Sequence, residues 1–475
     1  MSSLELCYLS ASQALQQFRE RSLSPRELMQ AIISRAEQTE PHINAFTDQY
    51  CEEALAAACA AETRYQKGKP APRPLEGLPL VVKDDAAIKG KRSTMGSLIY
   101  KDRISSKTDP HVERLLRAGA IVHARGNCSE FCAAWITHTR AHGTTRCPWN
   151  LEFTPGGSSG GSAASLAAGA TTIATGSDNA GSIRQPASAC GVVGYKPPHG
   201  RNPSMGPDSL DIASVVGPLT RTVADSALMQ NVMSGPHPRD ITALRQRVHL
   251  PASFGSIRGM KIAYSPDLDF FSVDADVRAN LDSTLDALRT EGAIVEHVKV
   301  GWSREVHDLG VEHWAHHSSI ATLENFENHA ELLCDYSAWY AEKTKEWVPR
   351  AFGEIVNLRA RMFETFGPVL AKYDAFICPT TAVSSIPATM GPDQFFEVDG
   401  QRINADFEWC LTYPFNLLGQ LPALSVPSGI ASNGVPTGIQ IIARAYDDAP
   451  VFKVGAAVER LRPWGYDGAA RVGTV

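Results

Sequence analysis

Residues 154–186 read TPGGSSGGSAASLAAGATTIATGSDNAGSIRQP, a glycine- and serine-rich start followed by two apolar segments. On composition alone, the start is typical of a flexible linker. A small-residue helix pattern follows at once over residues 160–169, however, and residues 171–175 form an apolar run typical of a buried strand. The stretch therefore predicts a loop, a helix and a strand inside a packed domain.

Helix and strand patterns alternate on both sides of this stretch. Because strands joined by helices pair in parallel and are covered on both faces, this alternation predicts the α/β class, with a mixed, mostly parallel central sheet between two layers of helices. The expected strands are residues 78–82, 120–124, 171–175, 261–264, 293–298, 373–378 and 438–443, and the expected helices include residues 110–118, 160–169, 274–290 and 449–461.

Two regions depart from this alternation. Residues 1–70 read as helices, and Ser24, Pro25 and Glu27 form the capping box that starts one of them. Residues 302–366 read as a helical insertion rich in Trp, His and Glu. No internal repeat or linker separates these regions, so residues 1–475 are expected to form a single domain.

Composition excludes several classes of protein. Hydrophobic residues make up 43% and charged residues 20% of the 475-residue chain, which is typical of a globular protein. The net charge of −6 argues against nucleic acid as the main ligand, because phosphate binding uses clustered Lys and Arg. With no basic and apolar leader at the N-terminus and no apolar run of about 18 residues, we expect a cytoplasmic chain without a membrane span.

Metal and disulfide sites are not expected either. The ten cysteines include no CxxC pair and lie scattered in apolar or helical contexts, which favours reduced thiols. The run from Glu312 to His317 contains three histidines, but no second ligand cluster accompanies it, so we assign it to a helix face. No metal and no cofactor are predicted.

Two other interpretations of the glycine–serine loop are weaker. The loop lacks the Gly-Lys-Ser/Thr ending of a phosphate-binding loop. Gly156-x-Ser158-x-Gly160 matches the nucleophile elbow of α/β-hydrolases, which would make Ser158 the nucleophile. That elbow follows a strand, whereas Phe153-Thr-Pro-Gly-Gly reads as a loop.

Longer motifs in the same region resemble the amidase signature family. They are Gly156-Gly-Ser158-Ser-Gly-Gly-Ser-Ala-Ala, Gly176-Ser-Asp-x-x-Gly-Ser182-Ile-Arg-x-Pro186 and Cys190-Gly-Val-Val-Gly-Tyr-Lys-Pro197. Further similar segments lie at residues 77–84, 127–131, 144–150, 378–381, 421–427 and 434–440. Together they cover most of the chain apart from the helical insertion. Because the motifs are long and interlocking, the resemblance is specific.

The resemblance implies a Lys–Ser–Ser triad, with Ser182 as the nucleophile, Ser158 as a bridging serine in a cis peptide and Lys83 as the base. A serine hydroxyl becomes a good nucleophile only when a base removes its proton. A hydroxyl both donates and accepts, so Ser158 can pass that proton on to Lys83. Lys83 can take it only when neutral, which burial at the end of an apolar strand promotes. Seen alone, Lys83 would be interpreted as an ion-pair partner of Asp84 or Asp85.

The resemblance also implies how the site is completed. The backbone N–H groups of Asn179, Ala180 and Gly181, with that of Ser182, are expected to hold the oxyanion of the reaction intermediate. Ala180 stands where glycine is usual in the family, which leaves the shape of this loop open. Cys132 is expected to line the substrate pocket, and a core cysteine is the alternative.

The sequence thus predicts a metal-free serine amidase that cleaves the C–N bond of an aryl or alkyl amide, or of a carbamate, through an acyl-enzyme. This small-molecule substrate is expected near the insertion, where Trp302, Trp314, Trp339 and Trp347 favour an apolar or aryl group. The alternative is the glutaminase subunit of a tRNA-dependent amidotransferase, in which a glutamine such as Gln185 is common. A non-catalytic binding protein is disfavoured because all three triad positions are filled. The sequence leaves open whether the chain forms a homodimer.

Overall fold

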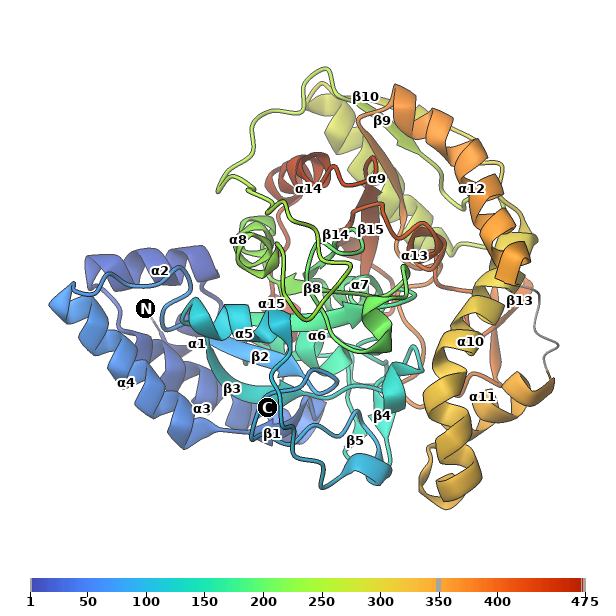
Figure 1. The fold of residues 1–475 in the computed structure, drawn as a ribbon. Helices are drawn as coiled ribbons and strands as arrows, with labels where there is room; N and C mark the ends of the chain where they lie inside the picture. Colours follow the sequence, from blue (N-terminus) through green and yellow to red (C-terminus); the bar gives the residue numbers. More distant parts are fainter. Residues whose placement is uncertain (1, 347–351, 471, 473–475) are drawn as a thin grey trace.

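The computed structural model describes residues 2–346, 352–470 and 472. An 11-stranded sheet runs through the molecule, and helices cover both of its faces (Figure 1). In spatial order the strands are β1 (Phe46–Gln49), β3 (Ile121–Gly126), β2 (Pro79–Lys83), β6 (Ile173–Asp178), β8 (Val215–Thr220), β7 (Val193–Lys196), β14 (Ala423–Ile430), β15 (Pro436–Ile442), β11 (Ala375–Pro379), β9 (Lys261–Tyr264) and β10 (Ile294–His297). The predicted α/β class, with a mixed sheet between helices, is confirmed.

The sheet contains fewer parallel strand pairs than the sequence predicts. Among the described strands, parallel pairs occur in two groups: β2 pairs with β3 and β6, and β9 pairs with β10 and β11. The pairs from β6 through β8, β7, β14 and β15 to β11 are antiparallel. Helices connect β2 to β3 and β9 to β10, whereas β14 and β15 form a hairpin, which makes antiparallel neighbours. The sheet is therefore mixed rather than mostly parallel.

The helices follow the sequence prediction closely, and the capping box of Ser24 and Glu27 is present at the start of α3. No described helix is both long and apolar enough to cross a membrane. The helices are α1 (Ser3–Cys7), α2 (Ala11–Glu20), α3 (Pro25–Ile43), α4 (Cys51–Lys67), α5 (Pro110–Arg117), α6 (Gly160–Ala167), α7 (Arg184–Cys190), α8 (Val223–Met233), α9 (Ala275–Thr290), α10 (Arg304–His329), α11 (Asp335–Glu346), α12 (Phe352–Lys372), α13 (Pro414–Leu417), α14 (Ala449–Leu461) and α15 (Asp467–Ala470). Two small hairpins are added by β4 (His138–Thr139) with β5 (Gly143–Thr144) and by β12 (Phe395–Val398) with β13 (Gln401–Asn404).

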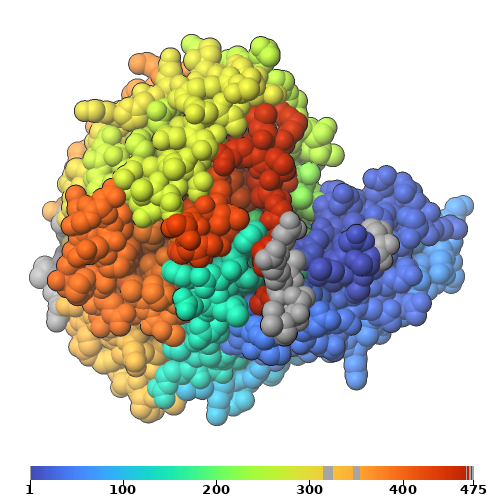
Figure 2. All heavy atoms as spheres, turned by 180° about the vertical axis from the view of Figure 1, so that it is seen from behind, coloured from blue at the N-terminus to red at the C-terminus, as the bar shows by residue number. Residues whose placement is uncertain are grey.

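The two regions that depart from the alternating pattern lie on opposite sides of the molecule. Helices α1–α4 gather on one side, and α10–α12, which form the predicted insertion, gather on the other (Figure 1). The same separation is visible from behind in Figure 2, where the first residues and residues 300–370 occupy opposite flanks. That residues 1–475 form one domain stays a prediction.

One tryptophan of the insertion lies elsewhere than predicted. Trp302 is buried, and its ring centroid lies 5.2 Å from that of Phe366 and 5.6 Å from that of Phe415. It therefore fills the core rather than the mouth of a pocket, because a large apolar ring gains most from full burial. The side chain of Trp314 and all of Trp347 lie outside the described residues.

Small residues allow α6 and α7 to lie against the sheet, and both helices are buried along their whole length. Gly194 of β7 faces α7, where a Cβ would lie only 2.7 Å from Ala187 Cβ. The next residue, Tyr195, points to the opposite face and packs in the core below α8, α9 and α14. Because α6 and α7 begin just after Ser158 and Ser182, their packing holds both serines at the same face of the sheet.

Candidate active site

Lys83 is the last residue of β2, between β3 and β6, and its side chain is fully buried. Three oxygen atoms surround its amine. Nζ lies 2.8 Å from Ser158 Oγ, 2.7 Å from Ser177 Oγ and 3.1 Å from Asp85 Oδ2. The structure thus brings Lys83 and Ser158 into hydrogen-bond contact and adds two polar groups beside them.

Two opposing effects set the charge of Lys83. Burial disfavours the ammonium form, but the carboxylate of Asp85 outweighs burial and raises the pKa of Lys83 above its ordinary value. Asp85 therefore favours the ammonium form of Lys83, which has to lose a proton before its amine can act as a base. The ion pair expected of a lone lysine is present, but it lies inside the protein.

Ser158 lies in a tight loop that leads into α6. The Gly157–Ser158 peptide bond is cis, as the family resemblance implies. The N–H of Gly157 donates to Gln185 Oε1 over 2.7 Å, and a Cβ on Gly157 would lie 2.5 Å from the carbonyl oxygen of Ala134. Glycine is therefore required at this position, and Gln185 of α7 holds the loop in place.

Ser182 precedes α7 and is 8% exposed. Its carbonyl oxygen accepts a 3.3 Å hydrogen bond from the N–H of Ser159, which ties the two serine loops together. Within the described part of the chain, the Ser182 hydroxyl makes no hydrogen bond, so the side-chain contact between Ser158 and Ser182 is not formed in this structure. The two candidate serines are neighbours through the backbone rather than through their hydroxyls.

A buried ion pair shapes the loop that carries Ser182. Asp178 and Arg184 are fully buried, and Arg184 Nη2 lies 3.0 Å from Asp178 Oδ1. Asp178 Oδ2 also accepts from the N–H of Ile183 over 3.2 Å. Burial alone would raise the pKa of Asp178, but the Arg184 guanidinium holds it below its ordinary value. Arg184 reaches Gln440 and Asn416 as well, so the loop is anchored across the sheet.

The loop from Asn179 to Ser182 leaves its backbone donors free. Within the described residues, none of its four N–H groups donates to a protein acceptor. Gly181 has φ 135°, and a Cβ there would lie 2.0 Å from Thr412 Oγ1, which excludes any larger residue. Thr412 donates to the carbonyl oxygen of Ala180 over 2.6 Å, and the Ala180 side chain is buried without positive φ. The departure from glycine at position 180 is thus accommodated.

A cavity of about 240 Å³ opens beside these groups. Cys132 lies in its wall and is half-buried, and its thiol lies 3.4 Å from Asp85 Oδ2. Phe131 and Met95 add apolar surface, while Ser177 adds a hydroxyl. The cavity therefore places an apolar wall next to the polar groups around Lys83.

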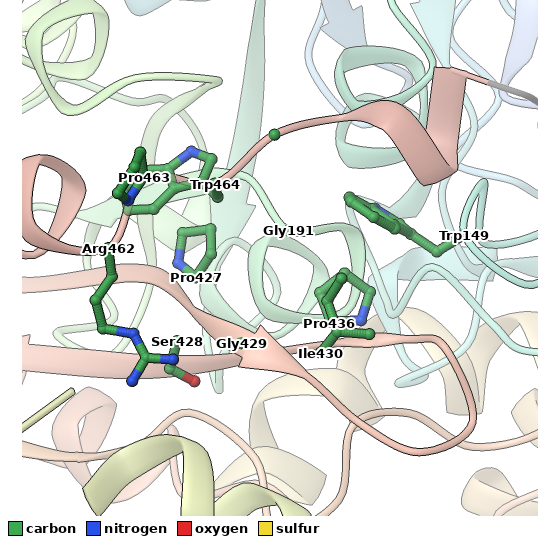
Figure 3. A pocket seen from close by; sticks show the side chains of 11 residues that line it. Trp149, Gly191, Pro427, Ser428, Gly429, Ile430, Pro436, Arg462, Pro463 and Trp464 are labelled. Carbon is green, nitrogen blue, oxygen red and sulfur yellow. The ribbon is translucent and has the colours of Figure 1, made fainter. Parts of the chain in front are cut away.

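A second cavity, of about 310 Å³, lies at the other end of α7 (Figure 3). Trp149, Gly191, Pro436 and Trp464 are among its lining residues. Lys83, Ser158 and Ser182 line neither cavity, but Asp85 and Ser177, which both contact the Lys83 amine, line the first. The walls of the second cavity carry no acid, base or nucleophile arranged as at Lys83. The candidate active site is therefore the cavity beside Lys83.

Sequence reasoning missed two polar neighbours of Lys83. Ser177 follows Thr175 by two residues on β6, and a strand places residues two apart on the same face. Thr175 itself accepts the N–H of Lys83 over 3.1 Å, which sets the register of the two strands. The sequence suggests Asp85 only as a partner for an exposed lysine. Strand periodicity in the motif was the signal that could have identified Ser177.

Among the described residues, no group of three or more His, Cys, Asp or Glu side chains is placed to hold a metal ion. In the histidine-containing run, His313 lies 3.3 Å from Asp211, and the side chains of His316 and His317 lie outside the described residues. All ten cysteines are free, and most are buried. The metal-free site stays a prediction.

A second buried lysine gives a prediction for stability. Lys196 at the end of β7 is fully buried, and its amine donates to the carbonyl oxygen of Leu421 over 2.8 Å. Burial, reinforced by the nearby Arg184 guanidinium, lowers the pKa of Lys196 to about 7. An unfolded lysine has a pKa of about 10.4. Between these pH values the unfolded chain holds a proton that the folded chain lacks, so the free energy of unfolding should rise with pH, by at most about 1.4 kcal/mol per pH unit.

Denaturant unfolding of the wild type and of Lys196→Met between pH 7 and 8.5 measures this effect. The free energy of unfolding of the wild type, relative to that of the variant, should increase with pH. A difference that stays constant over this range would show that Lys196 is charged in the folded protein.

Comparisons with known proteins identify the family of the chain. A family model described as Amidase matches residues 27–452. The chain is 32% identical over 468 residues to an acylamidase of Rhodococcus erythropolis, covering 98% of each chain. It is 35% identical over 490 residues to a glutamyl-tRNA(Gln) amidotransferase subunit of Chloroflexus aggregans, covering 97% of this chain and 98% of the relative. The solved structure of a bacterial aryl acylamidase of the amidase signature family superposes with a TM-score of 0.90 at 28% identity, covering 98% of both chains.

Proposed function

The chain belongs to the amidase signature family and is an amidase, and on this premise we propose that it hydrolyses aryl or alkyl amides through an acyl-enzyme on Ser182. The observation that carries the proposal is the buried hydrogen bond of 2.8 Å between Lys83 and Ser158, at the loop that bears Ser182. A buried amine next to a serine hydroxyl is the pairing that a base-activated nucleophile requires.

In the proposed mechanism, Ser182 Oγ attacks the amide carbonyl carbon. Its proton passes to Ser158, whose own proton passes to the lone pair of Lys83, which takes part in this step as the neutral amine. The oxyanion that forms is held by the backbone N–H groups of Asn179, Ala180, Gly181 and Ser182, which donate to no acceptor among the described residues. Lys83 then returns a proton through Ser158 to the leaving amine, and a water molecule hydrolyses the acyl ester by the same path.

The proposed mechanism uses only side chains, backbone groups and water, so it requires no metal and no cofactor. The substrate preference rests on the cavity, where Phe131, Met95 and Cys132 form an apolar wall suited to an aryl or alkyl group. The similarity to an acylamidase and to an aryl acylamidase structure supports the same preference. Carbamates share the carbonyl chemistry and are the next class to test.

The second candidate is the glutaminase role, which the similarity to the amidotransferase subunit favours. Gln185 does not add to that candidate, because its side chain accepts from Gly157 and serves the Ser158 loop. The two functions differ in whether a partner protein is required.

A substrate panel separates them. The purified chain alone should hydrolyse an anilide or an alkyl amide more than tenfold faster than it hydrolyses glutamine, because an apolar wall favours an apolar group by about 1–3 kcal/mol. Release of aniline, ammonia and alkyl amine would be measured side by side, with a carbamate as the fourth substrate. Hydrolysis of glutamine alone, or activity only in the presence of a partner protein, would favour the glutaminase role.

A further inference from the structure

One carboxylate oxygen of Asp85 lies within reach of three hydrogen-bond donors, the Lys83 amine among them. Its Oδ2 atom lies 3.1 Å from Lys83 Nζ, accepts from Ser177 Oγ over 2.5 Å and lies 3.4 Å from Cys132 Sγ. The side chain is 15% exposed and lines the cavity next to Lys83. A carboxylate that gathers three donors at one oxygen is held in a single orientation.

This arrangement decides which way a neutral Lys83 amine would point. A neutral amine has two N–H donors and one lone pair, whereas the ammonium has three donors. Asp85 is only an acceptor, and Ser177 gives its own proton to Asp85, so both accept from Lys83. The two donors are then used, and the lone pair is left for the third neighbour, Ser158.

We propose that Asp85, together with Ser177, is a positioning residue that aims the Lys83 amine at Ser158 and stabilises the ammonium formed when Lys83 takes the proton. The inference rests on the proposed function. When the Ser182 Oγ–carbon bond forms, the Oγ–H bond breaks, and Ser158 relays the proton to the lone pair of Lys83. The new positive charge then lies 3.1 Å from Asp85, and it disappears when the proton is passed to the leaving amine.

Other charges near this pair do not replace Asp85. Asp84 is held by Arg125 and by the N–H of Thr94, away from the Lys83 amine. The thiols of Cys128 and Cys132 lie near enough to Lys83 to influence its charge. Asp109, His111, Asp178 and Asp208 lie in the wall of the same cavity. Among the described residues, Asp85 is the only carboxylate in hydrogen-bond contact with Lys83.

The test is the pH dependence of Asp85→Asn, which keeps an acceptor of the same shape and removes the charge. Without the charge, Lys83 is easier to deprotonate and is also a weaker base. The acid limb of kcat/KM against pH should therefore move to lower pH, and the alkaline plateau should fall at least about tenfold, as expected for a weaker general base. Asp85→Glu restores the charge and should move the limb back toward that of the wild type.

Asp286→Asn is the control, because it removes an exposed carboxylate that pairs with Arg289 and does not line the cavity. Its acid limb should coincide with that of the wild type. If the acid limb of kcat/KM for Asp85→Asn lies at the same pH as that of the wild type, the proposal is overturned. Complete loss of activity at every pH, with the fold intact by circular dichroism, would overturn it too, because Asp85 would then be needed for the chemistry itself.

A probe that contains no amide separates failure of the proposed function from failure of the role proposed for Asp85. The rate at which a fluorophosphonate labels Ser182 reports how strongly Lys83 activates that hydroxyl, and it should shift with pH in Asp85→Asn as kcat/KM does. If no amide is hydrolysed but labelling of Ser182 shifts as expected, Asp85 keeps its role and only the substrate class is wrong. Labelling at another residue would overturn both proposals.

Discussion

Lys83→Ala should lower kcat/KM for an amide by about 10²–10⁴-fold, the range that a general base contributes. The reason is that Lys83 is the only amine in contact with Ser158 within the described part of the chain, and no histidine lies in the proposed proton path. Steady-state rates between pH 6 and 10 measure the loss. An alanine variant that keeps near wild-type activity over this range would rule out the Lys–Ser–Ser mechanism.

The controls for this substitution must separate chemistry from folding. Removing Lys83 leaves the partly buried Asp85 without its cation, which can itself destabilise the protein. The double variant Lys83→Met with Asp85→Asn removes both charges and keeps the volume, so it should fold and remain inactive. Lys91→Ala removes a partly exposed lysine paired with the exposed Glu53 and should stay close to wild-type activity, since surface pairs contribute about 0–1 kcal/mol.

The candidate site was predictable where its signal is local. Ser158 and Ser182 lie in glycine-rich loops that begin buried helices, and Lys83 ends an apolar strand, so each stands out within a few residues of sequence. The charge of Lys83 was not predictable in the same way, because it depends on how closely Asp85 approaches after the chain turns. Burial and an ion pair act in opposite directions, and only the structure says which is larger.

Contacts between distant segments could not be predicted from the sequence for the same reason. Arg184 binds Gln440 and Asn416, which lie far along the chain and meet it only because β14 and β15 close the centre of the sheet. The antiparallel centre also escaped prediction. A buried antiparallel strand has the same continuous apolar pattern as a parallel one, so periodicity cannot separate them.

Ser182→Ala should abolish turnover, with a loss of about 10⁴–10⁶-fold in kcat, because no acyl-enzyme can form without its hydroxyl. The fold should be unaffected, since that hydroxyl makes no hydrogen bond to the described residues and the side chain is small. The matched control is Ser188→Ala on α7, which follows Ser182, because its buried hydroxyl also has no hydrogen-bond partner among the described residues. Its turnover and melting temperature should both stay close to those of the wild type.

The identity of the nucleophile is decided by labelling rather than by loss of activity, because Ser158→Ala should also be inactive. A fluorophosphonate should modify Ser182 in the wild type, label Ser158→Ala only slowly and leave Ser182→Ala unlabelled, as read by peptide mass spectrometry. A nucleophile elbow at residues 156–160 makes the opposite prediction, with the adduct on Ser158. The geometry favours Ser182, because the hydroxyl of Ser158 already accepts from the Lys83 amine. Among the described residues, the hydroxyl of Ser182 makes no hydrogen bond, and the four backbone N–H groups of residues 179–182 have no acceptor. An adduct on Ser158 that persists in Ser182→Ala would reverse the roles of the two serines.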